Sequence, residues 1–187
     1  MTSEPTDLDY ALLRRVARQD QAALAELIRR HQGRLYQVAY RLLKDPLEAE
    51  DALQEVFLKA YEHAHRFEPQ ATVSAWLHRI TANHCLNLLR RRHPQESLDQ
   101  EGAPSPADPG ASPLQNLEEQ ELSRRLEQLL DNLPENQRRA LVLKRFAGLS
   151  YQEIGEMLGV PEKTVKSRLF DARRRLRRIL EKRGVTP

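Results

Sequence analysis

The stretch from Ser150 to Arg178 limits the fold most, because it encodes two short helices joined by a tight turn. Ser150 and Glu153 have the S-x-x-E spacing of a capping box, which predicts a helix start. Gly155 is small enough for another helix to cross closely, and Gly159 suits the left-handed position that ends a helix. A second helix follows, and its predicted buried stripe consists of Val165, Leu169, Ala172 and Leu176. This pattern is typical of a helix-turn-helix, whose second helix enters the major groove of DNA.

Charge is distributed unevenly along the chain. The formal net charge is only +3, yet residues 163–183 hold ten Lys and Arg against Asp171 and Glu181. A basic carboxyl end favours a polyanionic partner, because neutralising phosphates releases counterions. The alternative for the same residues is an ordinary helical hairpin whose positive charge is a solvated face.

The rest of the chain also shows helical spacing and no strand-like alternation, which predicts an all-α protein. Residues 8–43 indicate two helices, the first with a stripe formed by Leu8, Leu12 and Val16. At residues 45–48, D-P-L-E predicts a further helix start, with Asp as the cap and Pro in the first helical position. A loop at 67–69 precedes another helix at about 72–91.

Residues 94–113 are rich in proline, and the stretch 94–122 is acidic without a single Lys or Arg. Proline removes backbone donors and like charges repel, so this stretch is predicted to be a flexible acidic linker. The chain therefore divides into a helical domain at 1–93, the linker at 94–113 and a second helical domain at 114–187. The second domain is expected to be a bundle of about four helices, and its first stripe consists of Leu122, Leu126, Leu129, Leu130 and Leu133.

A second informative stretch runs from Trp76 to Arg92. Its inward face is predicted to hold Leu77, Thr81, His84 and Leu88. The adjacent stripe holds Trp76, Ile80, Asn83, Asn87 and Arg90. Asparagines hydrogen-bond base edges, an aromatic ring can stack on a base, and arginine holds phosphate, so this stripe suits nucleic acid. A core tryptophan beside solvated asparagines accounts for the same residues equally well.

Signals for catalysis, metal or membrane are weak. The sequence contains no phosphate-binding glycine loop, and the histidines lack partners at the spacing of a metal site. Cys85 lacks an obvious base and is predicted to be a small buried hydrophobe. We therefore expect no enzyme activity, cofactor, metal or small-molecule substrate. A single cysteine, a polar amino terminus and the lack of a run of about 18 apolar residues predict a cytoplasmic protein without membrane insertion.

Taken together, four segments resemble the bacterial RNA polymerase sigma factors of the extracytoplasmic function (ECF) group. Ala22–Arg34 resembles the opening helix of the family's region 2, and Leu47–Tyr61 resembles the family pattern A-E-D-hydrophobic-x-Q-E. Trp76–Arg92 resembles the pattern W-L-x-x-I-A-x-N, and Leu133–Arg178 resembles the family's region 4. The resemblance implies a factor that binds core RNA polymerase and promoter DNA, with an anti-sigma factor as a further partner.

The resemblance also implies residue roles. Contacts with core polymerase would come from Asp51, Gln54, Glu55 and Leu58. The −10 element would be opened and read by Trp76, Asn83, Asn87, Arg90 and Arg91. The −35 element would be read by Lys163, Lys166, Ser167 and Phe170, with phosphates held by Arg168, Arg173 and Arg174.

Three residues depart from the family or from their surroundings. Asn87 stands where many relatives have Asp, Thr81 stands where many have Ala, and Asp171 lies among basic neighbours. The promoter sequence can therefore not be carried over from the family. The alternative function is a stand-alone helix-turn-helix regulator, but that hypothesis leaves the acidic helix at 47–61 and the stretch 76–92 without a purpose.

Overall fold

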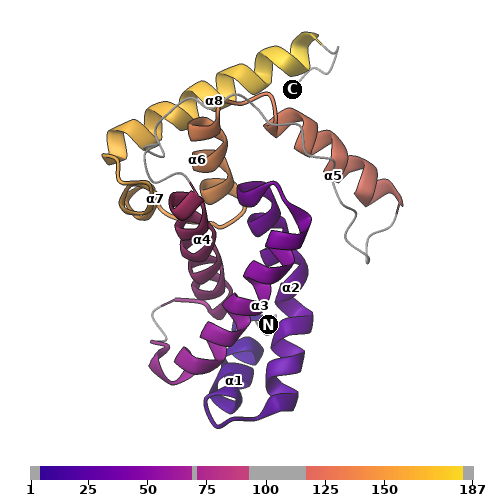
Figure 1. Ribbon diagram of the computed structural model, residues 1–187, viewed down its shortest axis with the longest axis vertical. Coiled ribbons are helices and arrows are strands. Elements are labelled where there is room, and N and C mark those ends of the chain that lie inside the picture. Colours follow the sequence, from indigo (N-terminus) through magenta and orange to yellow (C-terminus); the bar gives the residue numbers. More distant parts are fainter. Residues whose placement is uncertain (1–4, 69–70, 93–116, 183–187) are drawn as a thin grey trace, which may run out of the picture. The chain divides into compact units, whose positions relative to one another are not determined.

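A computed structural model describes residues 5–68, 71–92 and 117–182 of the chain (Figure 1). Side chains are described from residue 8 and, beyond the second gap, from residue 121. Helices are the only regular elements in these ranges, which confirms the predicted all-α class. They are α1 (Pro5–Val16), α2 (Gln21–Leu43), α3 (Pro46–His63), the 3-10 turn η1 (Ala64–Arg66), α4 (Val73–Arg92), α5 (Leu117–Leu130), α6 (Glu135–Arg145), α7 (Tyr151–Leu158) and α8 (Glu162–Lys182). The predicted linker at 94–113 lies outside the described residues.

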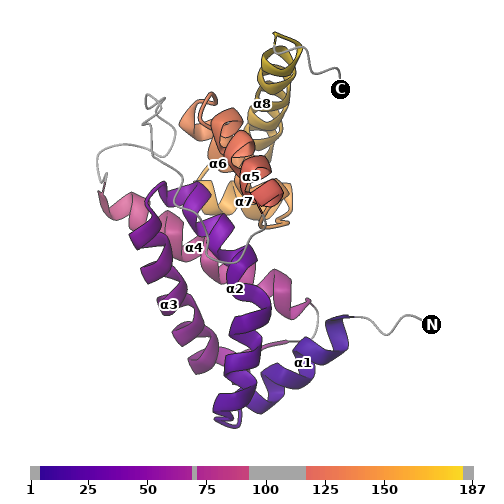
Figure 2. The same ribbon diagram turned by 90° about the vertical axis from the view of Figure 1, so that its right-hand side faces the viewer.

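The chain forms two compact units, Met1–Asn87 and Leu88–Pro187, and their boundary falls inside α4. In the N-terminal unit α2 packs against both α1 and α3 (Figure 2). The turn η1 contacts α1 and α3. The core of this unit includes Leu13, Leu27, Leu35, Val38, Leu42, Val56, Leu77 and Leu86. In the C-terminal unit α8 packs against α6 and α7. The core there includes Val142, Leu143, Ile154, Val165, Leu169 and Ala172.

Side-chain caps mark the starts of α2 and α3 in the N-terminal unit. The Asp45 carboxylate accepts the Glu48 backbone N–H at 2.9 Å, and Pro46 follows in the first turn, as predicted. Asp20 caps α2 by accepting the Ala23 backbone N–H at 3.1 Å. This short carboxylate satisfies an amide of the first turn, so Asp20 fixes where the second of the two helices expected at 8–43 begins.

Two predicted stripe positions are wrong, because Leu8 of α1 and Leu122 of α5 are exposed. The other members of the α1 stripe, Leu12 and Val16, are buried. Periodicity identifies the face of a helix that packs, but it does not say how far a neighbouring helix extends along that face.

Candidate nucleic-acid interface

The helix-turn-helix at α7 and α8 has the predicted local geometry. The Ser150 hydroxyl accepts the Glu153 backbone N–H at 3.2 Å, and the Glu153 carboxylate accepts the Ser150 backbone N–H at 2.8 Å. Both halves of the capping box are thus present, so two amides at the start of α7 are satisfied. Gly159 ends α7 in the left-handed region, with φ at 70°. The turn is therefore built from interactions between residues that are close in sequence.

Gly155 leaves room for the turn and for the start of α8. A Cβ atom at this position would lie 2.7 Å from the Val160 carbonyl oxygen and 3.6 Å from the Glu162 backbone nitrogen. The Val160 backbone N–H also donates to the Gly155 carbonyl at 2.9 Å. The nearest atom thus belongs to the connection before α8, and the helix that comes close to Gly155, as expected, is the amino-terminal end of α8 at Glu162.

The two faces of α8 separate as expected. Val165, Leu169 and Ala172 are buried, and Leu176 is half-buried. The outward positions are all exposed, and 64% of Phe170 is accessible. The Phe170 ring presents apolar surface among cations, and the Arg174 guanidinium lies 5.9 Å from the centroid of this ring. The exposed set comprises Lys163, Lys166, Ser167, Phe170, Arg173 and Arg174.

Several of these cations are held by neighbouring groups. Lys166 lies 2.6 Å from the Glu162 carboxylate, and this hydrogen bond and charge raise the pKa of the Lys166 ammonium. The Arg174 guanidinium lies 3.2 Å from the Asp171 carboxylate. Asp171, whose position among basic residues was unexplained by the sequence, thus pairs with a cation one turn further on.

Arg168 occupies a different environment from the other predicted phosphate ligands. Only 7% of the residue is exposed, and burial lowers the pKa of its guanidinium. Arg173 and Arg174 are exposed on the same helix. The structure therefore does not bring Arg168 to the surface that these two share, and a phosphate role for Arg168 remains only a prediction.

The α4 stripe is exposed at its polar positions. Asn83, Asn87, Arg90 and Arg91 are exposed, and Trp76 is half-buried with its ring 5.4 Å from the Phe67 ring. Of the predicted inward residues, Leu77 and Thr81 are buried, and the Thr81 hydroxyl donates to the Leu77 carbonyl at 2.9 Å. The other two, His84 and Leu88, are half-buried. The asparagines are accessible to a ligand, while the tryptophan is partly a packing residue.

The acidic face of α3 is accessible too. Asp51, Gln54 and Glu55 are exposed, and 51% of Leu58 is accessible. Leu47, at the start of the same helix, is also exposed, although the sequence did not single it out. The opposite face packs on the core through Ala49, Ala52, Leu53, Val56, Phe57 and Ala60. The exposed face therefore combines negative charge with apolar surface.

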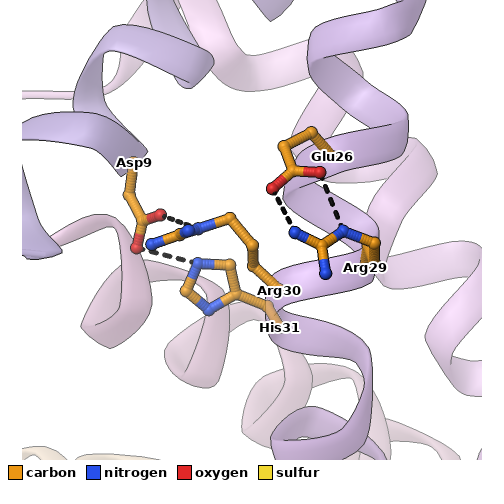
Figure 3. Close-up of polar contacts among 5 residues, drawn as sticks. All are labelled: Asp9, Glu26, Arg29, Arg30 and His31. Atoms are coloured by element: carbon orange, nitrogen blue, oxygen red, sulfur yellow. Dashed lines mark hydrogen bonds and ion pairs between the residues drawn. The ribbon is translucent and has the colours of Figure 1, made fainter.

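A buried polar cluster joins α1 to α2, and the sequence analysis did not identify it (Figure 3). The Asp9 carboxylate accepts from Arg30 at 2.7 Å and from His31 Nε2 at 3.0 Å. Burial lowers the pKa of His31, although the charge of Asp9 and its hydrogen bond oppose this shift. Glu26 and Arg29 form a separate exposed pair nearby at 2.6 Å. No short-range pattern could reveal the cluster, because its carboxylate lies on another helix.

Other candidate sites are not supported within the described residues. Among them no group of three or more His, Cys, Asp or Glu side chains could hold a metal ion. None of the described helices is long and apolar enough to cross a membrane. Cys85 is buried, and burial raises the pKa of its thiol to about 12, as expected for a packing residue rather than a nucleophile.

Comparison with known proteins identifies the family to which the chain belongs. The family model for Sigma-70 region 2 matches residues 27–94, and the model for Sigma-70, region 4 matches residues 123–176. The chain therefore belongs to the sigma-70 family of transcription initiation factors.

Individual relatives narrow the class further. The chain is 35% identical over 177 residues to the ECF RNA polymerase sigma factor SigW of Bacillus subtilis, covering 90% of this chain and 94% of that protein. It is 40% identical over 168 residues to the ECF RNA polymerase sigma factor SigE of Mycolicibacterium smegmatis, covering 87% of this chain and 65% of that protein. The solved structure of the sigma factor RpoE in complex with the anti-sigma factor NepR from Bartonella quintana is 27% identical, with a TM-score of 0.59, covering 84% of this chain and 96% of that one. The chain is a member of the ECF group of sigma factors.

Proposed function

We propose that this sigma factor binds core RNA polymerase with α3, reads the −35 element with α8 and opens and reads the −10 element with α4. We assign these tasks to a domain at 1–93 and a domain at 114–187, with 94–113 as the linker. The observation that carries the proposal is the exposed face of α8, where Phe170 lies among cations on the side opposite the buried stripe.

The face of α8 suits duplex DNA. Lys163, Lys166, Ser167 and Phe170 lie where a recognition helix contacts base edges, and Phe170 can contact a thymine methyl group. Arg173 and Arg174 are exposed further along the helix and suit phosphate. Glu162 holds Lys166 at 2.6 Å, so this ammonium is oriented before DNA arrives.

The face of α4 suits a single strand. Asn83 and Asn87 are exposed and can bond to base edges that are freed from pairing, while Arg90 and Arg91 add charge for the backbone. Capturing an unstacked base costs a few kcal/mol, which contacts in the bound state must offset.

Core polymerase is the partner proposed for α3, through Asp51, Gln54, Glu55 and Leu58. Leu58 supplies apolar surface to be covered, and the polar residues around it suit the polar rim of a protein interface. An anti-sigma factor is proposed as a further partner, since the RpoE structure was solved with one. The factor would act in the cytoplasm, where polymerase and promoters meet, without catalysing a reaction itself.

Transcription with sigma-free core polymerase tests the proposal. The purified chain is added to core enzyme with a genome-wide pool of promoter fragments, and run-off transcripts are sequenced. We expect co-elution with core and specific transcripts. DNA binding without core binding, and without promoter-dependent transcripts, would instead support the stand-alone regulator.

Two substitutions test the division of labour. Lys166→Ala should weaken binding to −35 duplex, whereas Asn83→Ala should slow promoter opening with −35 affinity intact. Lys182→Ala is the matched control, because it removes an exposed lysine from the same helix about 24 Å away. If Lys166→Ala and Asn83→Ala both lowered only general DNA affinity, the assignment of α8 and α4 would be wrong.

A further inference from the structure

We propose that α1 braces the start of α4 through Tyr10 and Phe67, and that these two rings are positioning residues for promoter opening. This inference rests on the proposed role of α4. The brace begins outside the region that the family model covers, since the match to Sigma-70 region 2 starts at residue 27.

The contact runs through three aromatic rings from three parts of the chain. The Phe67 ring centroid lies 6.0 Å from that of Tyr10, with the planes tilted by 48°. The Phe67 ring centroid also lies 5.4 Å from that of Trp76, with an interplanar angle of 68°. This second pair is edge-to-face, which is favourable because the positive ring edge meets the negative face. Phe67 therefore links α1 to α4.

The Phe67–Trp76 contact joins the two ends of the connection between η1 and α4. Phe67 directly follows η1, and its backbone N–H donates to the Ala64 carbonyl at 3.3 Å. Trp76 lies in the first turn of α4, where the Thr72 hydroxyl accepts the Ala75 backbone N–H at 3.1 Å. The start of α4 is thus held by a local cap and a ring contact, in addition to the buried side chains of Val73 and Leu77.

Tyr10 can act as a fixed support because α1 is itself anchored. The preceding residue, Asp9, is buried and contacts Arg30 and His31 of α2 (Figure 3). Leu12, Leu13 and Val16 are buried on the same helix. Leu8, by contrast, is exposed and offers a neutral position for comparison.

The consequence for DNA concerns the placement of Asn83. A site that captures a base must be held rigidly by packed side chains, because small displacements weaken its contacts. Asn83 lies about two turns after Trp76 on α4, so freedom at the start of the helix changes where Asn83 points. Tyr10 and Phe67 would then affect opening without touching DNA.

The experiment compares Tyr10→Ala with Tyr10→Phe and with Leu8→Ala, each assembled with core polymerase. Opening is followed on a duplex promoter and on the same promoter with its −10 region already mismatched. We expect Tyr10→Ala to open the duplex about two- to tenfold more slowly, to bind the mismatched template more weakly by a similar factor, and to co-elute with core as the wild type does. Tyr10→Phe, which keeps the ring, should behave as the wild type.

Trp76 is the single tryptophan of the chain, so its fluorescence reports the packing of the brace directly. Tyr10→Ala should shift its emission towards that of a solvated tryptophan, and Leu8→Ala should not. If Tyr10→Ala fails to fold, Phe67→Leu replaces it with the same expected results, because leucine keeps apolar volume but not the ring.

Equal opening rates for the Tyr10→Ala and Leu8→Ala proteins would overturn the brace. Slower opening by Tyr10→Phe would overturn it as well, since the ring is then not what matters. A wild-type holoenzyme that opens no promoter would refute the proposed function instead, and the Trp76 emission would still show whether the rings pack.

Discussion

The two units of this sigma factor differ in how their DNA-facing helices are supported. The turn before α8 is set by Ser150, Glu153 and Gly159, all within ten residues of one another. The start of α4 depends on Phe67 and, through it, on Tyr10, which lies more than fifty residues earlier. Reading duplex DNA needs one rigid face, which local interactions can provide. Holding an opened strand needs several elements to keep fixed positions relative to one another, and here contacts between residues far apart in sequence provide this.

The units also differ in their buried polar groups. The N-terminal unit buries His31 and His78, and five of the six histidines of the chain lie in it, with His93 outside the described residues. The described part of the C-terminal unit contains no histidine and instead buries Arg138 and Arg139 beside Glu135. The stability of the two units should therefore respond to different perturbations.

The largest expected effect is the loss of stability of the C-terminal unit when Glu135 is replaced. Glu135 contacts Arg138 at 2.5 Å and Arg139 at 2.7 Å. Burial would raise the pKa of Glu135, but the two guanidinium groups outweigh it and lower that pKa. Glu135→Gln should destabilise the unit by about 3 kcal/mol, because two buried cations each lose an ionic partner. Urea denaturation followed by circular dichroism measures this.

Glu121→Gln is the matched control for that change. Glu121 pairs with Arg125 at 3.0 Å, but both side chains are more than half exposed. Its loss should cost at most about 0.5 kcal/mol. Equal losses for the two variants would show that burial around Glu135 does not matter.

A second pair of substitutions compares a glycine from each unit. Gly155→Ala should destabilise the C-terminal unit by about 1–3 kcal/mol, because the new methyl group would meet the Val160 carbonyl oxygen at 2.7 Å. Gly33→Ala in α2 should stabilise the N-terminal unit by about 0.5–1 kcal/mol. A Cβ atom at Gly33 would meet no atom within 4 Å beyond the neighbouring backbone of its own helix, and alanine favours a helix. Thermal melts of both variants measure whether Gly155→Ala lowers the stability and Gly33→Ala raises it.

A smaller effect should come from a change of pH between 7.5 and 5.5, and it should arise in the N-terminal unit. Burial is the main cause that lowers the pKa of both His31 and His78 from the ordinary value of 6.5. The unfolded chain then binds more protons than the folded one near pH 6, so stability present above pH 6.5 is lost as the pH falls below it. Urea titrations at pH 7.5 and 5.5, read by Trp76 fluorescence, should show this loss. His31→Gln should reduce the pH dependence, and an unchanged dependence in both His31→Gln and His78→Gln would contradict this account.

The smallest expected effect concerns Cys85, which should not react with an alkylating reagent while the protein is folded. Cys85 is buried in the N-terminal unit with a thiol pKa of about 12, so the folded protein should resist alkylation at pH 8. Labelling should begin only when urea unfolds that unit. Because Gly155 and Glu135 belong to the other unit, their variants should label at the wild-type rate, and faster labelling would show that the units are coupled.

Short-range patterns made much of the fold predictable. The capping box at Ser150, the cap at Asp45 and the two faces of α8 depend on residues three or four positions apart, which is the reach of a helical turn. The exposure of Asn83 and Asn87 followed from the same periodicity. The roles assigned to these residues came from the family resemblance rather than from spacing.

The sequence by itself thus determined which residues share a helix face and where the turns fall, because those features arise within one element. Tertiary structure decided how wide each buried stripe is and which side chains meet across elements. Arg168 is buried beside Val165 and Leu169, whereas Leu8 and Leu122 are exposed, because packing partners and not periodicity set the limits of a stripe. The contact of Asp9 with His31, and the stack from Tyr10 through Phe67 to Trp76, exist only because the fold brings separate helices together.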